Sequence, residues 1–440
     1  MIRSARETEP APTRTERQFQ QLKTSIHEEL VASLDLSDVA TVEQRFVREE
    51  VQELTKLICR RRKLKLEDSA EQRLKSELLD EVFGLGPLET LMNDPEISDI
   101  LVNGPEAVFV ERHGRLEPAD IVFADNQHVT RIIQRVVSRV GRRIDESNPM
   151  VDARLPDGSR INAVIPPLAI TGPKLCIRRF DVGNLLMKNL VENGTLSQQM
   201  AQFLSAAVHS RSSILISGGT GAGKTTLLNA LSESIPADER IITVEDSAEL
   251  SLQHAHVVSL ETRNANSEGN GEVRPRDLVR NSLRMRPDRI IVGEVRGDES
   301  LDMLQAMNTG HEGSLTTIHA NDTRDALARL EMMVAMTGLE LPVNVVRKYV
   351  ASGICLVIHV ARLKGGRRKV MQVSEIIDAG SNDYRLEEIF GFRQQGLDEN
   401  GVANGAFHAT GYQPQCLDRF PDFGVTVPES IFHPSPAEQG

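Results

Sequence analysis

Residues 218–225 read GGTGAGKT and match the pattern G-x-x-x-x-G-K-[ST] at every fixed position. Glycines at these positions let the backbone fold tightly around an anion with successive N–H groups pointing inward. The flanking sequence agrees, because residues 213–216 are a short apolar run typical of a strand and residues 225–234 predict a helix. This order predicts an α/β fold in which a phosphate-binding loop opens a helix.

The residue types of this loop predict what each position binds. Lys224 places a positive charge on the β- and γ-phosphates of a nucleotide, and the hydroxyl of Thr225 can hold Mg²⁺. The pattern therefore predicts ATP and Mg²⁺ as ligands. The expected nucleotide-binding residues are Gly218, Gly219, Thr220, Gly221, Ala222, Gly223, Lys224, Thr225 and Thr226.

Composition narrows the class of protein. A chain of 440 residues has room for two or three domains, and a net charge of −12 without a long basic run argues against direct binding to nucleic acid. No stretch approaches the roughly 20 apolar residues of a membrane span, and the N-terminus lacks the apolar core of a secretory signal, so we expect a cytoplasmic protein. The cysteines are far apart and form no C-x-x-C pair, which predicts free thiols, no disulfides and no zinc: Cys59, Cys176, Cys355 and Cys416.

Changes in composition and in the spacing of apolar residues along the sequence predict the domain organisation. Three-to-four spacing of apolar residues predicts helices in residues 19–84, either as a small bundle or as a docking module for a partner. The predicted parts are a disordered tail at 1–18, this helical region at 19–84, an α+β domain at 85–180, a linker at 181–195, and an α/β domain at 196–440 with a mobile loop at 263–271 and an extension of short strands and turns from about 380.

Three further segments place polar residues at predicted strand ends. Glu294 ends the apolar run 289–293, the acidic cluster 245–249 follows the run 241–244, and His319 follows 315–318. The carboxyl ends of parallel strands meet at one edge, where ligands bind. Glu294 is expected to order Mg²⁺ or the attacking water. Glu245 or Glu249 could polarise that water, Asp246 could hold Mg²⁺ with Thr225 and Glu294 or cap a helix, and His319 is expected to sense the γ-phosphate.

The order and spacing of these segments resemble the secretion NTPase superfamily of type II secretion, type IV pilus and type IV secretion motor ATPases. Within it, LRMRPDRIIVGEVRG at 283–297, the segments that follow it to Pro342, and MVDARLPDGSRINAVIPP at 150–167 resemble the tight-adherence (Flp, type IVc) pilus ATPases called CpaF or TadA. The resemblance runs from about Leu85 to Phe392. It implies a RecA-like P-loop NTPase domain and a cytoplasmic homohexamer at the inner membrane, held there by platform proteins and acting on pilin subunits indirectly.

The resemblance also implies that positive charge from the α+β domain completes the site, because an arginine can stabilise charge on the γ-phosphate. The candidates are Arg154, Arg160, Arg178 and Arg179, and each could instead be a solvated charge on a strand. Arg154 and Arg160 are the favoured pair because they flank a Pro-Asp-Gly turn. The chain departs from pilus-extension and type II enzymes in lacking a four-cysteine zinc motif.

Three functions are compatible with these patterns. The leading hypothesis is an ATPase motor that assembles, with or without retraction, a tight-adherence pilus. The second is a type IV secretion ATPase for conjugation or effector export. The third is a nucleotide-regulated scaffold with little turnover, which the presence of Lys224, Glu294 and His319 disfavours.

Overall fold

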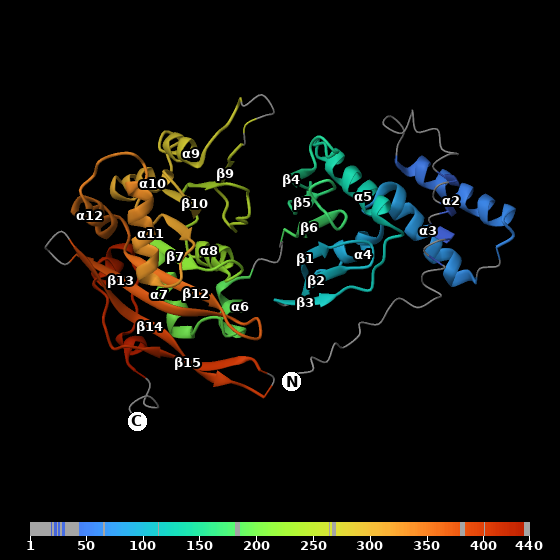
Figure 1. Cartoon of the computed structure of the whole chain (residues 1–440). Helices are drawn as coiled ribbons and strands as arrows, with labels where there is room; N and C mark the ends of the chain where they lie inside the picture. The colour runs from blue at the N-terminus through green and yellow to red at the C-terminus, as the bar shows by residue number, and fades with distance from the viewer. Residues whose placement is uncertain are drawn as a thin grey trace, which may run out of the picture. The chain divides into compact units, whose positions relative to one another are not determined.

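The chain forms two compact units, Met1–Asp181 and Val182–Gly440, each described here by itself (Figure 1). The computed structural model describes residues 44–64, 67–112, 114–180, 185–263, 265, 270–378, 383–399 and 401–434. It also describes the helical residues 19, 22, 23, 25, 26, 29 and 30. The predicted disordered tail 1–18 and most of the predicted loop 263–271 lie outside the described residues.

Helices form the first layer of the first unit. The helices α2 (Gln44–Arg61) and α3 (Asp68–Phe83) enclose an apolar cluster in which Ile26, Leu30 and Leu74 are fully buried. Two short helices follow, η2 (Gly86–Leu88) and α4 (Glu89–Met92). Buried Glu81 of α3 forms an ion pair with Lys23 at 3.3 Å, and its carboxylate lies 3.0 Å from Nε2 of His128. This second contact connects α3 to the helix that begins near His128.

A six-stranded antiparallel sheet of order β3-β2-β1-β6-β5-β4 completes the first unit. The helix α5 (Asn126–Arg139) starts at Asp125, whose side chain accepts from the N–H of His128, and it covers one face of the sheet. Burial alternates along the strands because alternate side chains pack against α5 in one core. The strands are β1 (Ile97–Val102), β2 (Val108–Arg112), β3 (Arg115–Pro118), β4 (Met150–Arg154), β5 (Arg160–Val164) and β6 (Lys174–Arg178).

A nine-stranded mixed sheet of order β15-β14-β13-β12-β7-β11-β10-β8-β9 organises the second unit. Its parallel part is β7 (Ile214–Gly218), β8 (Ile241–Glu245), β9 (Val257–Glu261), β10 (Arg289–Val295), β11 (Leu315–Ile318) and β12 (Leu356–Arg362). Antiparallel strands extend it from β12: β13 (Arg368–Asp378), β14 (Tyr384–Leu397) and β15 (Ala403–Ala409).

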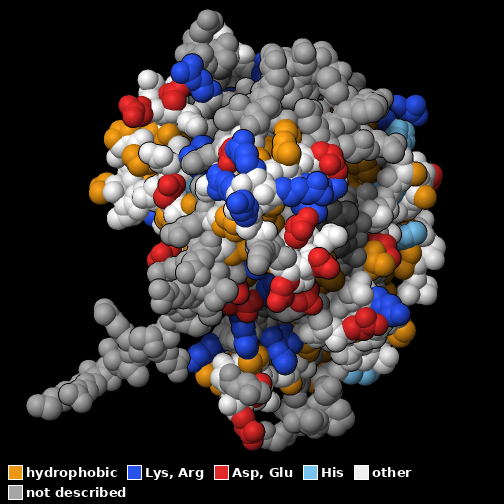
Figure 2. Space-filling model, turned by 90° about the vertical axis from the view of Figure 1, so that its right-hand side faces the viewer, with side chains coloured by type: hydrophobic (Ala, Val, Ile, Leu, Met, Phe, Trp, Pro, Cys, Tyr) orange, Lys and Arg blue, Asp and Glu red, His pale blue; other side chains and the backbone are white. Residues whose placement is uncertain are grey.

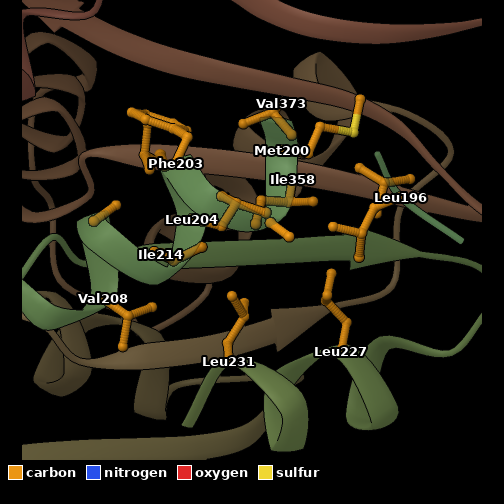
Figure 3. Close-up of a cluster of buried hydrophobic side chains, with 14 of the residues drawn as sticks. Leu196, Met200, Phe203, Leu204, Val208, Ile214, Leu227, Leu231, Ile358 and Val373 are labelled. Atoms are coloured by element: carbon orange, nitrogen blue, oxygen red, sulfur yellow. The ribbon is translucent and has the colours of Figure 1, made fainter. Parts of the chain in front are cut away.

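Helices cover both faces of this sheet, which explains why every residue of β7 is buried. Ile214 and Ile216 pack on one side and Leu215 on the other. The first side carries α6 (Met187–Glu192), α7 (Gln198–His209), α8 (Lys224–Ser232), η3 (Gln415–Phe423) and η4 (Glu429–Phe432); the second carries α9 (Pro275–Ser282), α10 (Glu299–Asn308), α11 (Thr323–Ala335) and α12 (Val343–Gly353). Figure 3 shows side chains of α7 and α8 meeting those of β7, β12 and β13.

The amino ends of the parallel strands are held by a buried ion pair. Arg289, the first residue of β10, has no exposed surface and contacts both carboxylate oxygens of Glu239. Its guanidinium also donates to the carbonyls of Val208 at 2.7 Å and Gly313 at 3.2 Å. Four contacts therefore satisfy this charge inside the unit.

Two expectations differ from the structure. The extension from about 380 was expected to hold short strands, and this is wrong, because β14 has 14 residues and joins the central sheet. Its burial does not alternate, so period-two analysis misses it. The interval 181–195, expected as a linker, contains α6, whose Met187 and Leu190 are buried in the core of the second unit.

Among the described residues, no helix is long and apolar enough to cross a membrane. On the face shown in Figure 2, Lys and Arg side chains lie close to Asp and Glu side chains, so neither sign covers that face.

Candidate functional site

The loop between β7 and α8 is shaped by its glycines. Gly221 and Gly223 have φ values of +69° and +97°, which favour glycine. A Cβ on Gly218 would lie 2.3 Å from the carbonyl oxygen of Val360, so β7 and β12 approach too closely for any side chain at that position. The loop therefore ends at the N-terminus of α8 with its backbone held against the neighbouring strand, as phosphate binding requires.

Lys224 lies inside this loop. Its Nζ donates to the carbonyl oxygens of Gly218 at 3.1 Å and Gly219 at 3.3 Å, and the residue is 8% exposed. Among the residues that the structure describes, no carboxylate lies within ion-pair distance of this ammonium. Burial lowers the pKa of Lys224, while the carboxylate of Glu294 acts in the opposite direction. A buried ammonium without a carboxylate partner favours an anionic ligand.

His319 links Lys224 to Glu294. Its Nε2 lies 3.3 Å from Nζ of Lys224 and 2.7 Å from Oε1 of Glu294. Burial and the neighbouring Lys224 ammonium lower the pKa of His319, so the neutral imidazole is favoured. Both contacts use Nε2, so a change of charge at either neighbour alters the surroundings of the same ring nitrogen.

An irregularity in β10 directs Glu294 to this position. The register between β10 and β11 shifts between Val292 and Val295, as at a β-bulge, and bulges re-aim side chains. The hydroxyl of Thr317 donates to the carbonyl of Gly293 at 2.7 Å and fixes the irregular segment. Glu294 is consequently held at the carboxyl edge beside His319.

Arg296 joins the two acidic segments. Its guanidinium donates to Oε2 of Glu294 at 2.6 Å and to Oδ2 of Asp246 at 3.1 Å. Lys224, His319, Glu294, Arg296 and Asp246 thus form one connected chain of polar contacts. The sequence had placed Glu294, His319 and Asp246 at strand ends, but it gave no role to the arginine that joins them.

Glu245 and Glu249 occupy different environments within the acidic cluster. Glu245 is 5% exposed, and its Oε1 accepts from the backbone N–H groups of Glu249 at 2.8 Å and Leu250 at 2.9 Å. A Cβ on Gly293 would lie 2.8 Å from Cγ of Glu245, so glycine at 293 makes room for this side chain. These contacts make Glu245 a support for the turn after β8, whereas Glu249 is half-buried.

A second arginine that the sequence did not indicate reaches the loop from β13. Nε of Arg368 donates to the carbonyl oxygen of Gly221 at 3.1 Å, and its Cδ lies 3.1 Å from where a Cβ on Gly223 would stand. Arg368 is far from the loop in sequence and reaches it only because β12 pairs with β7 and then with β13. No local motif could have revealed it.

Oxygen donors suitable for Mg²⁺ lie at the same edge. Mg²⁺ prefers hard oxygen ligands from one or two carboxylates together with substrate phosphates. Glu294 and Asp246 share Arg296, and Thr225 stands in the first turn of α8 directly after Lys224. The donor set fits the ion, and these three residues are the ones that would hold it.

Three of the four candidate arginines form a row across the first unit's sheet. The strand register pairs Arg154 with Arg160, Arg160 with Arg178, and Arg178 with Asp99. These three arginines and Asp99 therefore lie on one face of the sheet. Arg178 contacts Asp99 at 3.1 Å.

Arg154 and Arg179 make further contacts within the first unit. Arg154 donates to the carbonyl of Gly158 at 3.1 Å and lies over the ring of Phe180. Arg179 follows the end of β6, and its guanidinium donates to the carbonyls of Asp94 and Ile97. It therefore supports the start of β1.

Comparison with known proteins places these features in context. A family profile described as "Type II/IV secretion system protein" matches residues 81–381. A Mycobacterium tuberculosis protein named "Putative conjugal transfer protein" is 41% identical over 308 residues, covering 69% of this chain and 87% of that protein. The type IV secretion system protein VirB11 of Brucella suis is 32% identical over 305 residues, covering 63% and 84%.

Some solved structures are similar to this chain. The crystal structure of the Brucella suis VirB11 ATPase with sulphate matches at 30% identity and a TM-score of 0.36, covering 67% of this chain and 97% of that one. The pilus retraction motor PilT with bound ADP matches at 20% identity and a TM-score of 0.49, covering 68% and 82%.

Proposed function

Because the chain belongs to the type II/IV secretion system ATPase family, we propose that it is a motor that hydrolyses ATP at the loop 218–226. The observation that carries this proposal is buried Lys224, which has no carboxylate partner among the described residues and lies beside a histidine–glutamate pair. A scaffold that only binds nucleotide would not need Glu294 and His319 at the phosphate end of the loop.

Each side chain has a distinct role in this proposal. Lys224 and the loop N–H groups hold the β- and γ-phosphates, and Thr225 with Asp246 and Glu294 holds Mg²⁺, which would neutralise phosphate charge. Glu294 or Glu249 orients the attacking water. His319 lies 2.7 Å from Glu294 and would donate to the γ-phosphate, so its contacts would differ before and after hydrolysis, which a conformational switch requires.

Two substitutions separate binding from hydrolysis. Lys224→Ala removes a ground-state phosphate contact and should weaken nucleotide binding, whereas Glu294→Gln should keep binding and lose hydrolysis. The measurements are binding of a fluorescent ATP analogue and release of phosphate. Glu312→Gln is the matched control, because Glu312 pairs with Arg419 on the surface. Normal turnover by Glu294→Gln would refute the assignment.

We further propose a homohexameric ring whose sites are completed by the first unit. The support is the arginine row Arg154, Arg160 and Arg178, since adding cationic groups to a phosphoryl-transfer site lowers its barrier. Arg160→Ala in the full chain should keep nucleotide binding and hexamer mass and lose turnover. Arg115→Ala, which changes an exposed arginine on β3, is the control. Full turnover by Arg160→Ala, or a monomer with ATP and Mg²⁺, would contradict this proposal.

The cellular task divides two branches of the family. We propose assembly of a tight-adherence pilus through an inner-membrane platform, with pilin moved indirectly and no direct contact with nucleic acid. The sequence resemblance at 283–342 and 150–167 supports this branch, while the relatives named for conjugal transfer and VirB11 support type IV secretion. Deleting the gene and restoring it as wild type or as Glu294→Gln separates the branches. Loss of surface pili supports the first, and loss of DNA or effector export with intact pili supports the second.

A further inference from the structure

Two cysteines far apart in sequence meet beside a buried glutamate in the second unit. Cys355 immediately precedes β12, Glu375 lies in β13 opposite Leu356, and Cys416 lies in η3. One ligand atom from each of the three lies within 4.8 Å of those of the other two. Cys416 and Glu375 are 5% and 2% exposed, and Cys355 is half-buried.

The carboxylate of Glu375 is held in a fixed orientation. Oε2 accepts from the hydroxyl of Tyr412 at 2.7 Å and from the N–H of Gln415 at 2.8 Å. Oε1 accepts from the N–H of Cys416 at 2.7 Å, and the thiol of Cys416 makes a further side-chain contact with this carboxylate. A metal ion bound to both groups would take the place of the thiol proton in that contact, because metal ligands are deprotonated.

This carboxylate also lacks a countercharge. Within the described part of the chain, no Lys, Arg or His forms an ion pair with Glu375. A buried carboxylate without a cation is costly, because three neutral hydrogen bonds replace water only in part. The group next to it is a pair of thiols, which offers no positive charge. The site therefore contains a carboxylate and two soft ligands, and none of the described Lys, Arg or His side chains is paired with the carboxylate.

We propose that Cys355, Cys416 and Glu375 bind one Zn²⁺ ion. Two thiolates and one carboxylate are ligand types that zinc takes in tetrahedral sites, and the fourth position is open to a water molecule. Soft thiolate ligands favour zinc over Mg²⁺ or Ca²⁺. The ion supplies the countercharge of Glu375 and binds the thiols that the fold brings together.

The site lies away from the nucleotide loop. β12 runs parallel to β7, with Leu356 opposite Ile214 and Val360 opposite Gly218. Cys355 thus lies at the amino edge and the loop at the carboxyl edge, separated by about five residues of strand or roughly 17 Å. Zinc here would fasten η3 to β12 and β13 and would not take part in phosphate chemistry. This proposal departs from the sequence prediction of free thiols and no zinc, because the spacing of Cys355 and Cys416 in the sequence does not show that they meet.

The test uses the full-length protein. It is purified under reducing conditions, stripped with a chelator and titrated with Zn²⁺ alone in competition with a chromophoric chelator, and separately with Co²⁺, whose thiolate bonds absorb in the near ultraviolet. We expect one tightly held zinc per chain, a thiolate–Co²⁺ band in wild type, and a higher Tm after zinc is restored. The Co²⁺ band needs no variant and remains informative if a substitution impairs folding.

Matched variants locate the site. Cys416→Ser and Cys355→Ser should lose the zinc equivalent and the Co²⁺ band, and Glu375→Gln should bind zinc at least tenfold more weakly. Cys176→Ser changes a thiol in the first unit and should behave as wild type. Zinc that persists in Cys416→Ser, an absence of stoichiometric zinc in wild type, or a Cys355–Cys416 disulfide found by mass analysis of the reduced preparation would overturn the proposal.

Discussion

The two edges of the parallel strands in the second unit use the same residue types in opposite environments. At the amino edge, Arg289 is wholly buried and is bound to Glu239 and to two carbonyl groups. At the carboxyl edge, Arg296 exposes 60% of its side chain while it contacts Glu294 and Asp246. The buried pair cannot exchange partners without unfolding its surroundings, whereas the exposed chain of contacts can rearrange around a ligand. Burial therefore separates charges that stabilise the fold from charges available for chemistry.

The largest expected effect is at the amino edge. Glu239→Ala leaves the buried Arg289 charge without its carboxylate and should lower the free energy of unfolding by about 3–5 kcal/mol. Chemical denaturation of the whole chain measures this loss. The control Glu312→Ala breaks an exposed pair with Arg419 and should cost about 0–1 kcal/mol. Equal losses for the two variants would remove the distinction between buried and exposed pairs.

The next effect concerns turnover at the carboxyl edge. His319→Ala should lower kcat by about 10²–10³-fold, as removal of one transition-state hydrogen bond does. The unfolding midpoint should change little, because the ring is 36% exposed. His256→Ala removes a histidine that contacts Arg240 just before β9 and should leave kcat unchanged. A His319→Ala variant that hydrolyses ATP and changes shape with ATP like wild type would show that His319 has no role in turnover.

A smaller effect distinguishes adjacent glycines in the loop. Gly218→Ala places a methyl group 2.3 Å from the carbonyl oxygen of Val360 and should destabilise the protein by about 1–3 kcal/mol, as overpacking does. Gly219→Ala meets no atom within 4 Å and should stay within about 0.5 kcal/mol of wild type. Thermal unfolding of both variants checks the difference. If the two are equally stable, the close approach of β7 and β12 is not maintained in solution.

The smallest effect is on pH dependence. The pKa of His319 is lowered by burial and by Lys224, so protonation opposes the folded state. Stability from this group is complete above the unfolded histidine pKa of about 6.5 and is lost as pH falls through the lower folded pKa. Urea midpoints from pH 8 to 5 should fall less steeply for His319→Ala than for wild type. Parallel curves would show that His319 titrates alike in both states.

The order of residues in the sequence explains why contacts at the carboxyl edge of the parallel strands could be predicted and those at the amino edge could not. Glu294 and His319 follow apolar runs directly, and Asp246 follows one after Glu245, so strand polarity alone predicts that they meet. Glu239 and Arg289 meet at strand starts, where sequence offers no reason to expect a buried arginine. Arg368 reaches the loop only because β13 pairs with β12, and Cys416 reaches Cys355 only because η3 packs on the core of the same unit. Local motifs identify residues near strand ends, whereas contacts such as those of Arg368 and Cys416 depend on the packing of elements that are distant in the sequence.

The arginine row of the first unit has a consequence for ionic conditions. Like charges on neighbouring strands repel, and Asp99 contacts Arg178 at one end of the row. Added salt weakens repulsion over a Debye length of about 8 Å at physiological ionic strength. Salt weakens the Arg178–Asp99 contact as well, so the salt dependence of stability measures whether repulsion or ion pairing is larger along this row. A multivalent anion placed across the row contacts several arginines at once, so polyphosphate should change this stability at far lower concentration than simple salt.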